Sequence, residues 1–290
     1  MEITPLLRTL GRRPVLLGLL AGAAMLAGCS STRLLDSLTP EGAYALDRDR
    51  AYGDHPRQRL DVYRPETRDT GTVIVFFYGG SWRWGDKADY RFVAESLTRQ
   101  GITVVIPDYR VYPEVTFPGF VEDGAQALRW VRDNLAGHGD SRVFVMGHSA
   151  GAHIAALVAL DPRYRPADVA GFVGISGPYD FLPFTSARTA EIFSGADDLA
   201  QTQPITFAGP GSPPALLFHG AEDRIVYTHN AENLTAALRR SGVPVRYVLY
   251  EDRGHVDIML GLSSVLAGDG RLIAELLDFL RRPALSSAER

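Results

Sequence analysis

The sequence has one cysteine in 290 residues and no long block of like charge. A single cysteine excludes an intramolecular disulfide, so the fold must depend on its hydrophobic core alone. Thirty lysines and arginines oppose 34 aspartates and glutamates, for a formal charge of -4, and they give no sign of a nucleic-acid or acidic partner. None of the seven histidines shows metal-ligand spacing with a carboxylate or the cysteine. We therefore expect neither a metal nor a cofactor.

An apolar stretch near the N-terminus is too short to span a bilayer comfortably. Residues 15–28 (VLLGLLAGAAMLAG) follow three arginines, which is the order of a secretory export signal. Its end, LAGC, resembles the lipoprotein box of bacteria, in which the cysteine is acylated after cleavage. The resemblance implies a signal peptide over residues 1–28 and lipidation of Cys29. Ser30 then favours the outer membrane, with the protein facing the periplasm, over the inner membrane.

The rest of the chain divides into a polar stretch and one large domain. Residues 29–56 are polar and aperiodic, which predicts a tether. After that the composition stays uniform, without repeats or low-complexity tracts, and 46% hydrophobic residues suffice for a sizeable core. We predict a catalytic domain over residues 57–284 and a C-terminal tail over residues 285–290.

Two alternating patterns indicate the fold class. Continuous apolar, β-branched runs are typical of strands buried on both faces of a parallel sheet, and segments with helical periodicity lie between them. This alternation predicts an α/β fold with a doubly wound, mostly parallel sheet. The expected strands are residues 60–63, 73–78, 103–106, 143–146, 172–175, 216–219 and 245–249, and the expected helices are residues 90–100, 120–134, 150–160, 230–240 and 271–280.

A serine between two glycines stands at the end of one expected strand. The segment GHSAG follows the run VFVM and precedes a helical segment. Small residues beside the apex allow a sharp turn from strand to helix, which would lift the hydroxyl of Ser149 clear of the sheet. The free N–H groups of the helix would then face whatever the serine attacks. The pattern indicates a nucleophile elbow.

A serine hydroxyl needs a base, and the base needs an orienting carboxylate. The loop GAEDRIV follows the strand at 216–219 and places acids at the carboxyl edge of the sheet, where such sites gather. Asp223 is the predicted acid, and the adjacent Glu222 is the alternative. His255 follows the strand at 245–249 in the same way. It is the predicted general base.

The other histidines are interpreted as structural. His148 and His153 lie close to Ser149 in the sequence, but the turn and the helix are expected to point them away from the reaction, toward packing or supporting hydrogen bonds. His219 ends a buried strand and is expected to bond a backbone group. The other three lie in segments interpreted as surface: His55, His138 and His229.

Acyl transfer also needs hydrogen-bond donors for the oxyanion. The segment YGGSW follows the strand at 73–78, and its consecutive glycines allow backbone N–H groups to approach a substrate closely. Gly80, Ser81 and Ala150 are the predicted donors, and the alternative is a plain glycine turn. Some aromatic residues near these loops are candidates for the substrate pocket and equally for the core: Trp82, Trp84, Phe181 and Phe184.

In their order, these motifs resemble those of the α/β-hydrolases. YGGSW is similar to the HGG-x-W oxyanion loop, GHSAGAH to the elbow, SGPYD to a segment after the next strand, HGAEDRIV to the acid loop and GH to the base. The resemblance covers roughly residues 57–282 and is nearest to carboxylesterases of the hormone-sensitive-lipase type and to kynurenine formamidase-like esterases. It implies a serine hydrolase that cleaves small acyl or aryl esters without a cofactor. Tyr78 stands where the family has histidine, which leaves the substrate class open.

Two other functions fit the same motifs. An arylformamidase, amidase or peptidase of this fold would differ only in pocket and leaving group, and a non-enzymatic envelope lipoprotein would keep the fold as a binding module. The segment between Ser176 and Ala215 shows no sustained amphipathic helix. We therefore expect a small cap insertion and a preference for acyl groups of roughly two to six carbons. The sequence does not indicate the oligomeric state.

Overall fold

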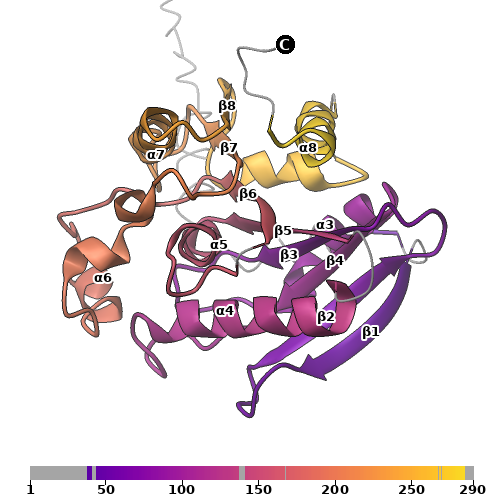
Figure 1. The fold of residues 1–290 in the computed structure, drawn as a ribbon, viewed down its shortest axis with the longest axis horizontal. Helices are drawn as coiled ribbons and strands as arrows, with labels where there is room; N and C mark the ends of the chain where they lie inside the picture. The colour runs from indigo at the N-terminus through magenta and orange to yellow at the C-terminus, as the bar shows by residue number, and fades with distance from the viewer. Residues whose placement is uncertain are drawn as a thin grey trace, which may run out of the picture.

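A computed structural model of the chain describes residues 38–40, 44–136, 141–166, 168–266, 268 and 270–284. Eight strands form one sheet in the order β1-β2-β4-β3-β5-β6-β7-β8 (Figure 1). β2 is antiparallel to both of its neighbours, and the strands from β4 to β8 are parallel. The strands are β1 (Tyr44–Ala51), β2 (Arg59–Pro65), β3 (Thr72–Phe77), β4 (Ile102–Pro107), β5 (Arg142–His148), β6 (Val169–Ile175), β7 (Ala215–Gly220) and β8 (Val245–Tyr250).

Helices cover both faces of the sheet. Phe77 of β3 packs toward α4 and α5, whereas Phe144 of β5 points to the opposite face, where its ring meets Phe279 of α8 at 6.0 Å. α3 lies on the α8 side (Figure 1). The helices are α3 (Arg91–Thr98), α4 (Gly119–Val131), α5 (Ala150–Leu160), α6 (Ala187–Ile192), α7 (His229–Arg240) and α8 (Arg271–Arg281). This arrangement is the expected α/β-hydrolase fold.

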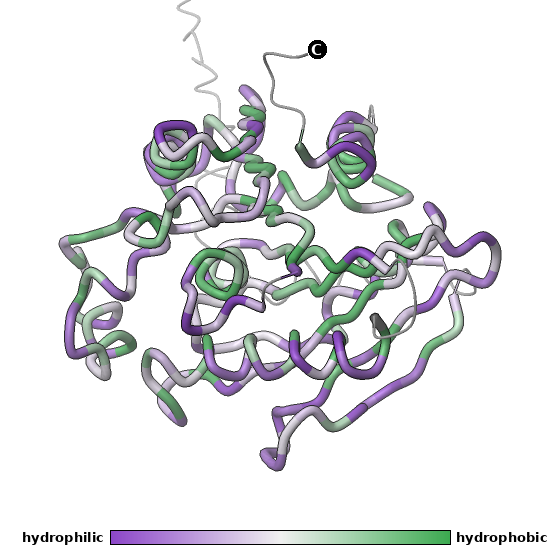
Figure 2. The backbone as a smooth tube through the Cα atoms, in the orientation of Figure 1, coloured by the Kyte–Doolittle hydropathy of each residue, from purple (hydrophilic) through white to green (hydrophobic). Residues whose placement is uncertain are grey.

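The central strands and α5 form the core. Every residue of β3, of β4 and of α5 is buried, so these segments lack the alternation of a half-exposed element. Figure 2 shows this core as an apolar centre, surrounded by helices whose outer faces are polar. The expected strands and the five expected helices are confirmed, with bounds that differ by a few residues.

β1 is the strand that the sequence pattern did not predict. Its residues, YALDRDRA, lie within the stretch predicted as a tether, and so the folded part begins before residue 57. An edge strand has one neighbour and one face toward solvent, and it therefore needs no continuous apolar run. Cys29, the signal segment 1–28 and the tail 285–290 lie outside the described residues.

The insertion between β6 and β7 is the small cap that the sequence predicts. Its one α-helix, α6, has six residues, and two short 3₁₀ helices follow at Leu199–Thr202 and Pro204–Phe207. In Figure 1 these segments extend from the sheet at the left of the view, beside α5. None of the described helices has the length and apolar character needed to cross a membrane.

Candidate active site

Ser149 occupies a sharp turn between β5 and α5. Its backbone has φ 54 and ψ -125, a combination that L-residues rarely adopt, and the helix begins at the next residue. The turn also requires glycine: a Cβ on Gly151 would lie 2.1 Å from the carbonyl oxygen of Phe77, and one on Gly147 would lie 2.3 Å from that of Gly151. The expected elbow geometry is therefore present, with the serine at its apex.

The three residues selected from the sequence lie within hydrogen-bond distance of one another. Ser149 Oγ is 2.8 Å from His255 Nε2, and His255 Nδ1 is 2.8 Å from Asp223 Oδ2. An ionised carboxylate only accepts hydrogen bonds, so Nδ1 carries the proton and Nε2 accepts from the serine hydroxyl. All three residues are buried, at 9%, 9% and 4% exposure for Ser149, His255 and Asp223. Glu222, the alternative acid, is exposed to solvent.

Asp223 is held as an anion. Its burial favours the neutral acid, but side-chain hydrogen bonds from His219 and His255 outweigh that effect and hold the pKa of Asp223 well below its usual range. The backbone N–H groups of Ile225 and Val226 donate to its other oxygen, each at 2.9 Å. The carboxylate is therefore fixed in place and stays charged opposite His255.

Three further histidines support this arrangement, as their sequence positions predict. The ring of His148 donates through Nε2 to the carbonyl oxygen of His255, at 2.8 Å. Burial, and next the neighbouring His255, lower the pKa of His148 to about 3, so it stays neutral. His219 bonds the backbone carbonyl of Val226 at 2.8 Å. His153 bonds the carbonyl of Thr202 at 2.8 Å and accepts from the indole N–H of Trp82.

The loop after β3 packs directly against the elbow. A Cβ on Gly79 would lie 3.1 Å from the Cβ of Ser149, so a larger residue would push the elbow away by a few tenths of an ångström. Ser81 and Trp82 both have positive φ, 52 and 57. In the described part of the chain, no acceptor is found for the N–H groups of Gly80, Ser81 and Ala150. Three unpaired backbone donors thus belong to the two loops that meet at the serine hydroxyl.

Tyr78, which stands where the HGG-x-W motif that the sequence resembles has histidine, anchors this loop. Its hydroxyl donates to Asp108 Oδ1 at 2.6 Å and accepts from Arg57 at 2.9 Å. The ring stacks on Tyr109 and Tyr90, with centroids 4.8 and 5.4 Å away. The same arginine also donates to the carbonyl of Gly85 at 2.9 Å, at the far end of the loop. Tyr78 and Arg57 together therefore connect both ends of the loop to the segments beside β2 and β4.

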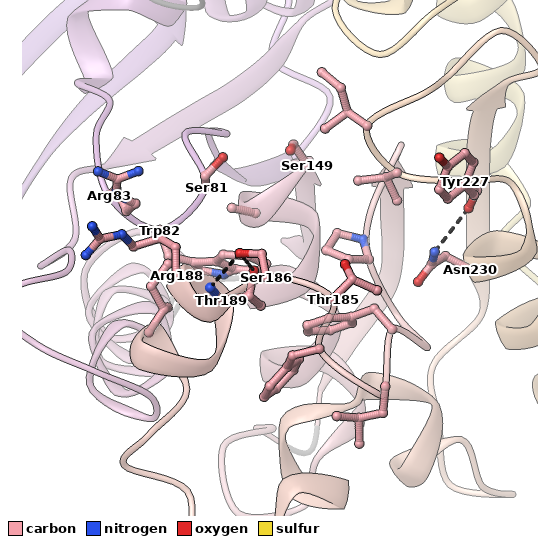
Figure 3. Close-up of a pocket in the computed structure, with 18 of the residues that line it drawn as sticks. Ser81, Trp82, Arg83, Ser149, Thr185, Ser186, Arg188, Thr189, Tyr227 and Asn230 are labelled. Carbon is pink, nitrogen blue, oxygen red and sulfur yellow. Dashed lines mark hydrogen bonds between the residues drawn. The ribbon is translucent and has the colours of Figure 1, made fainter. Parts of the chain in front are cut away.

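A pocket of about 570 Å³ opens beside Ser149 (Figure 3). Its walls come from the loop after β3, the start of α5, the cap and the segment between β7 and α7. The four aromatic residues named from the sequence all line it: Trp82, Trp84, Phe181 and Phe184. Trp82 is also part of the buried core, whereas Trp84 is 42% exposed at the rim.

No cluster of three potential metal ligands occurs among the residues that the structure describes.

The model of one protein family, BD-FAE, matches residues 60–238, more than half of the chain. The chain belongs to the BD-FAE family. The matched region contains the loop after β3, the elbow and the acid loop, and it ends before His255.

Relatives of this BD-FAE chain include named esterases. It is 32% identical over 239 residues to esterase LipC of Mycobacterium tuberculosis. The aligned region covers 70% of this chain and 58% of LipC. It is 30% identical over 239 residues to the isoprenylcysteine alpha-carbonyl methylesterase ICME of Arabidopsis thaliana. This aligned region covers 72% of the chain and 56% of ICME. The chain thus spans less than two thirds of the length of these curated relatives.

Solved esterase structures share the fold of this BD-FAE chain. Esterase B of Lactobacillus rhamnosis superposes with a TM-score of 0.77 over 95% of this chain and 97% of its own, at 19% identity. An esterase of Pyrobaculum calidifontis gives a TM-score of 0.73 over 87% of this chain and 90% of its own, at 25% identity.

Sequence reasoning missed several residues of the BD-FAE pocket. Arg83 and Arg188 line it, as do Tyr227 and Asn230 from the segment after the acid loop. His229, interpreted as surface, is exposed but also lines this wall, whereas His138 lies outside the described residues. Whether these residues line the pocket depends on where the cap and the loop after β7 fold over the elbow. No local pattern in the sequence carries that information.

Proposed function

We propose that this chain is a serine carboxylesterase that cleaves small acyl or aryl esters. The observation that carries the proposal is the continuous hydrogen-bonded series from the Ser149 hydroxyl through His255 to the buried carboxylate of Asp223, with 2.8 Å at each step. This is the arrangement that makes a serine hydroxyl nucleophilic, because the histidine accepts its proton and the carboxylate stabilises the cation that results.

The proposed reaction has two halves. In the first, His255 Nε2 takes the proton of Ser149 as Oγ attacks the ester carbonyl. The N–H groups of Gly80, Ser81 and Ala150 bind the oxyanion, and His255 then gives its proton to the leaving alcohol as the carbon–oxygen bond breaks. In the second half, His255 takes a proton from water as the water oxygen attacks the acyl carbonyl. It then returns that proton to Ser149 Oγ as the acyl–Oγ bond breaks and the carboxylic acid leaves. No cofactor takes part in this sequence.

The names of the relatives support an ester rather than an amide substrate, because LipC and ICME are both named as esterases. Arylformamidase or peptidase activity would use the same three residues, so only the leaving group separates the alternatives. We expect an aryl acetate to be cleaved faster than the matched anilide. A preference for the anilide or for a formamide would identify an amidase.

Replacement of Ser149 by alanine tests the nucleophile. We expect Ser149→Ala to lower esterase activity by about a thousandfold or more while the midpoint of thermal unfolding changes little. A fluorophosphonate probe should label the folded wild-type protein at Ser149 and leave the variant unlabelled. Activity within tenfold of wild type would exclude the proposed nucleophile, and an unlabelled, inactive wild type would favour a binding lipoprotein.

We also propose that the protein is anchored in the bacterial envelope through Cys29, on the periplasmic side of the outer membrane. The support is the sequence LAGC after the basic and apolar signal segment. Cys29→Ser should abolish incorporation of a palmitate analogue and leave an uncleaved precursor. Labelling that persists in this variant would refute the anchor without affecting the proposed reaction.

A further inference from the structure

We propose that the pocket beside Ser149 selects esters that carry a carboxylate remote from the scissile bond, and that Arg83 is the residue that binds this carboxylate. The inference rests on the proposed esterase function and adds to it a substrate class. It comes from the charge distribution on the pocket wall.

The charge of the pocket differs from that of the whole protein. The chain has four more acidic than basic residues. The wall nevertheless contains two arginines, Arg83 and Arg188, and no aspartate or glutamate among the residues described as lining it. In Figure 3 the two guanidinium groups lie at the same end of the pocket, near Ser81. Two like charges gathered at one end of a cavity create a positive potential that attracts an anion.

Arg83, unlike Arg188, makes no ion pair with a carboxylate of any residue that the structure describes. The guanidinium lies over the exposed ring of Trp84, 4.9 Å from the centroid. Cation–π attraction to the indole restricts the guanidinium, and none of its N–H groups is bonded within the described residues, so they are available to bind a carboxylate through two hydrogen bonds.

Arg188 provides an internal comparison because its charge is already partly balanced. Its guanidinium lies 2.6 Å from Glu191 Oε2, 3.4 Å from the hydroxyl of Tyr112 and over the ring of that tyrosine. An anion would gain less from this group than from Arg83. The ranking of the two arginines is thus fixed by their surroundings and can be tested.

The remaining wall suits the uncharged part of such a substrate. Phe181, Phe184 and Ile192 line the cap side, and Ile225 and Val226 line the opposite side. A short apolar body would bind between these walls with the carbonyl at Ser149. A terminal carboxylate would then reach the arginines at the end of the pocket, instead of burying its charge against phenylalanine rings.

The experiment compares each carboxylate ester with its neutral primary amide. The first pair carries the charge on the alcohol side and consists of 4-acetoxybenzoate and 4-acetoxybenzamide. The second pair carries it on the acyl side and consists of monomethyl glutarate and the methyl ester of glutaric acid monoamide. For at least one pair, we expect the wild type to favour the carboxylate about tenfold in kcat/KM. That preference should weaken in 0.5 M salt.

The variants assign the preference to a residue. Arg83→Gln should reduce the ratio of the two kcat/KM values to about one, and Arg83→Lys should keep part of the preference. Arg188→Gln should reduce the ratio by only about two- to threefold. The matched control is Arg240→Gln, at the exposed end of α7, which changes the net charge equally and should leave the ratio unchanged.

The two hypotheses fail differently. If the neutral esters are cleaved in a Ser149-dependent manner but neither pair shows a preference, or if the preference survives Arg83→Gln, the anion site is refuted and the esterase function stands. If Ser149→Ala cleaves the neutral esters as fast as the wild type, the esterase proposal fails, and the substrate class fails with it.

Discussion

Removal of the hydroxyl from Tyr78 should measure how firmly the loop after β3, which carries two of the proposed oxyanion donors, is held. Tyr78→Phe keeps the ring and its stacking on Tyr90 and Tyr109 but removes the donor to Asp108 and the acceptor for Arg57. Asp108 keeps its hydrogen bond from the backbone N–H of Lys87 at 2.9 Å, so its carboxylate loses one donor and retains another.

The size of the effect follows from the partners that remain. Arg57 keeps the carbonyl oxygens of Tyr109 and Gly85, at 2.8 and 2.9 Å. A buried hydrogen bond to a charged group contributes about 1.5–3 kcal/mol, and the surviving bonds place the loss near the middle of that range, about 2 kcal/mol. For a domain of this size, that corresponds to a fall of about 4–8 °C in the midpoint of thermal unfolding. A loosened loop should also reduce kcat about tenfold with little change in KM.

Calorimetry and steady-state kinetics on the purified protein would test both effects. Tyr247→Phe is the matched control, because the Tyr247 hydroxyl is buried and no partner for it is found in the described part of the chain, so its removal should cost nothing. If Tyr78→Phe unfolds within 1 °C of wild type, or no lower than Tyr247→Phe, Tyr78 does not anchor the loop in the way described.

Asp223→Asn should lower kcat about a thousandfold or more by leaving His255 in the wrong tautomer, whereas Glu222→Gln should have almost no effect; the reverse ranking in ester assays would reassign the acid. Burial lowers the pKa of His148 to about 3 and that of His153 to about 4, so the unfolded chain binds more protons below about pH 6.5 and stability is lost as pH falls. These two histidines should together reduce the free energy of unfolding by about 4 kcal/mol between pH 7 and pH 5. Denaturant titrations that give the same free energy of unfolding at both pH values would contradict this. Nitrophenyl esters below their micelle concentrations should show preference for acyl groups of roughly two to six carbons, and rising efficiency through long chains would indicate a lipase instead.

The interior of the fold was predictable because its signal is local. A strand buried on both faces must be apolar throughout, and runs such as VIVFF and ALLFH therefore mark β3 and β7 without any knowledge of their neighbours. β1 carries no such signal, since an edge strand is satisfied by one hydrogen-bonded partner. Its existence depends on pairing with β2, which is a property of the folded sheet.

The candidate site divides in the same way. Ser149, Asp223 and His255 each follow a predicted strand, and the carboxyl ends of parallel strands meet at one edge, so their proximity could be expected from the topology. Arg83 and Arg188 could not be placed together by this reasoning. One follows β3 and the other lies in the cap, and their common position depends on how the cap folds back over the elbow.

Tyr78 occupies the position of the histidine in the HGG-x-W motif that the sequence resembles, and the three anchors of the loop after β3 account for this difference. Tyr78 connects it to Asp108 and Arg57, and the backbone carbonyl of Trp82 accepts from Tyr112 at 2.8 Å. The indole N–H of Trp82 bonds His153, which in turn bonds the cap. Each anchor comes from a different segment, so no single side chain must hold the positive-φ turn at Ser81 and Trp82. A phenol in place of an imidazole is therefore compatible with the same donor geometry, provided that the surrounding carboxylate and guanidinium are present to bond it.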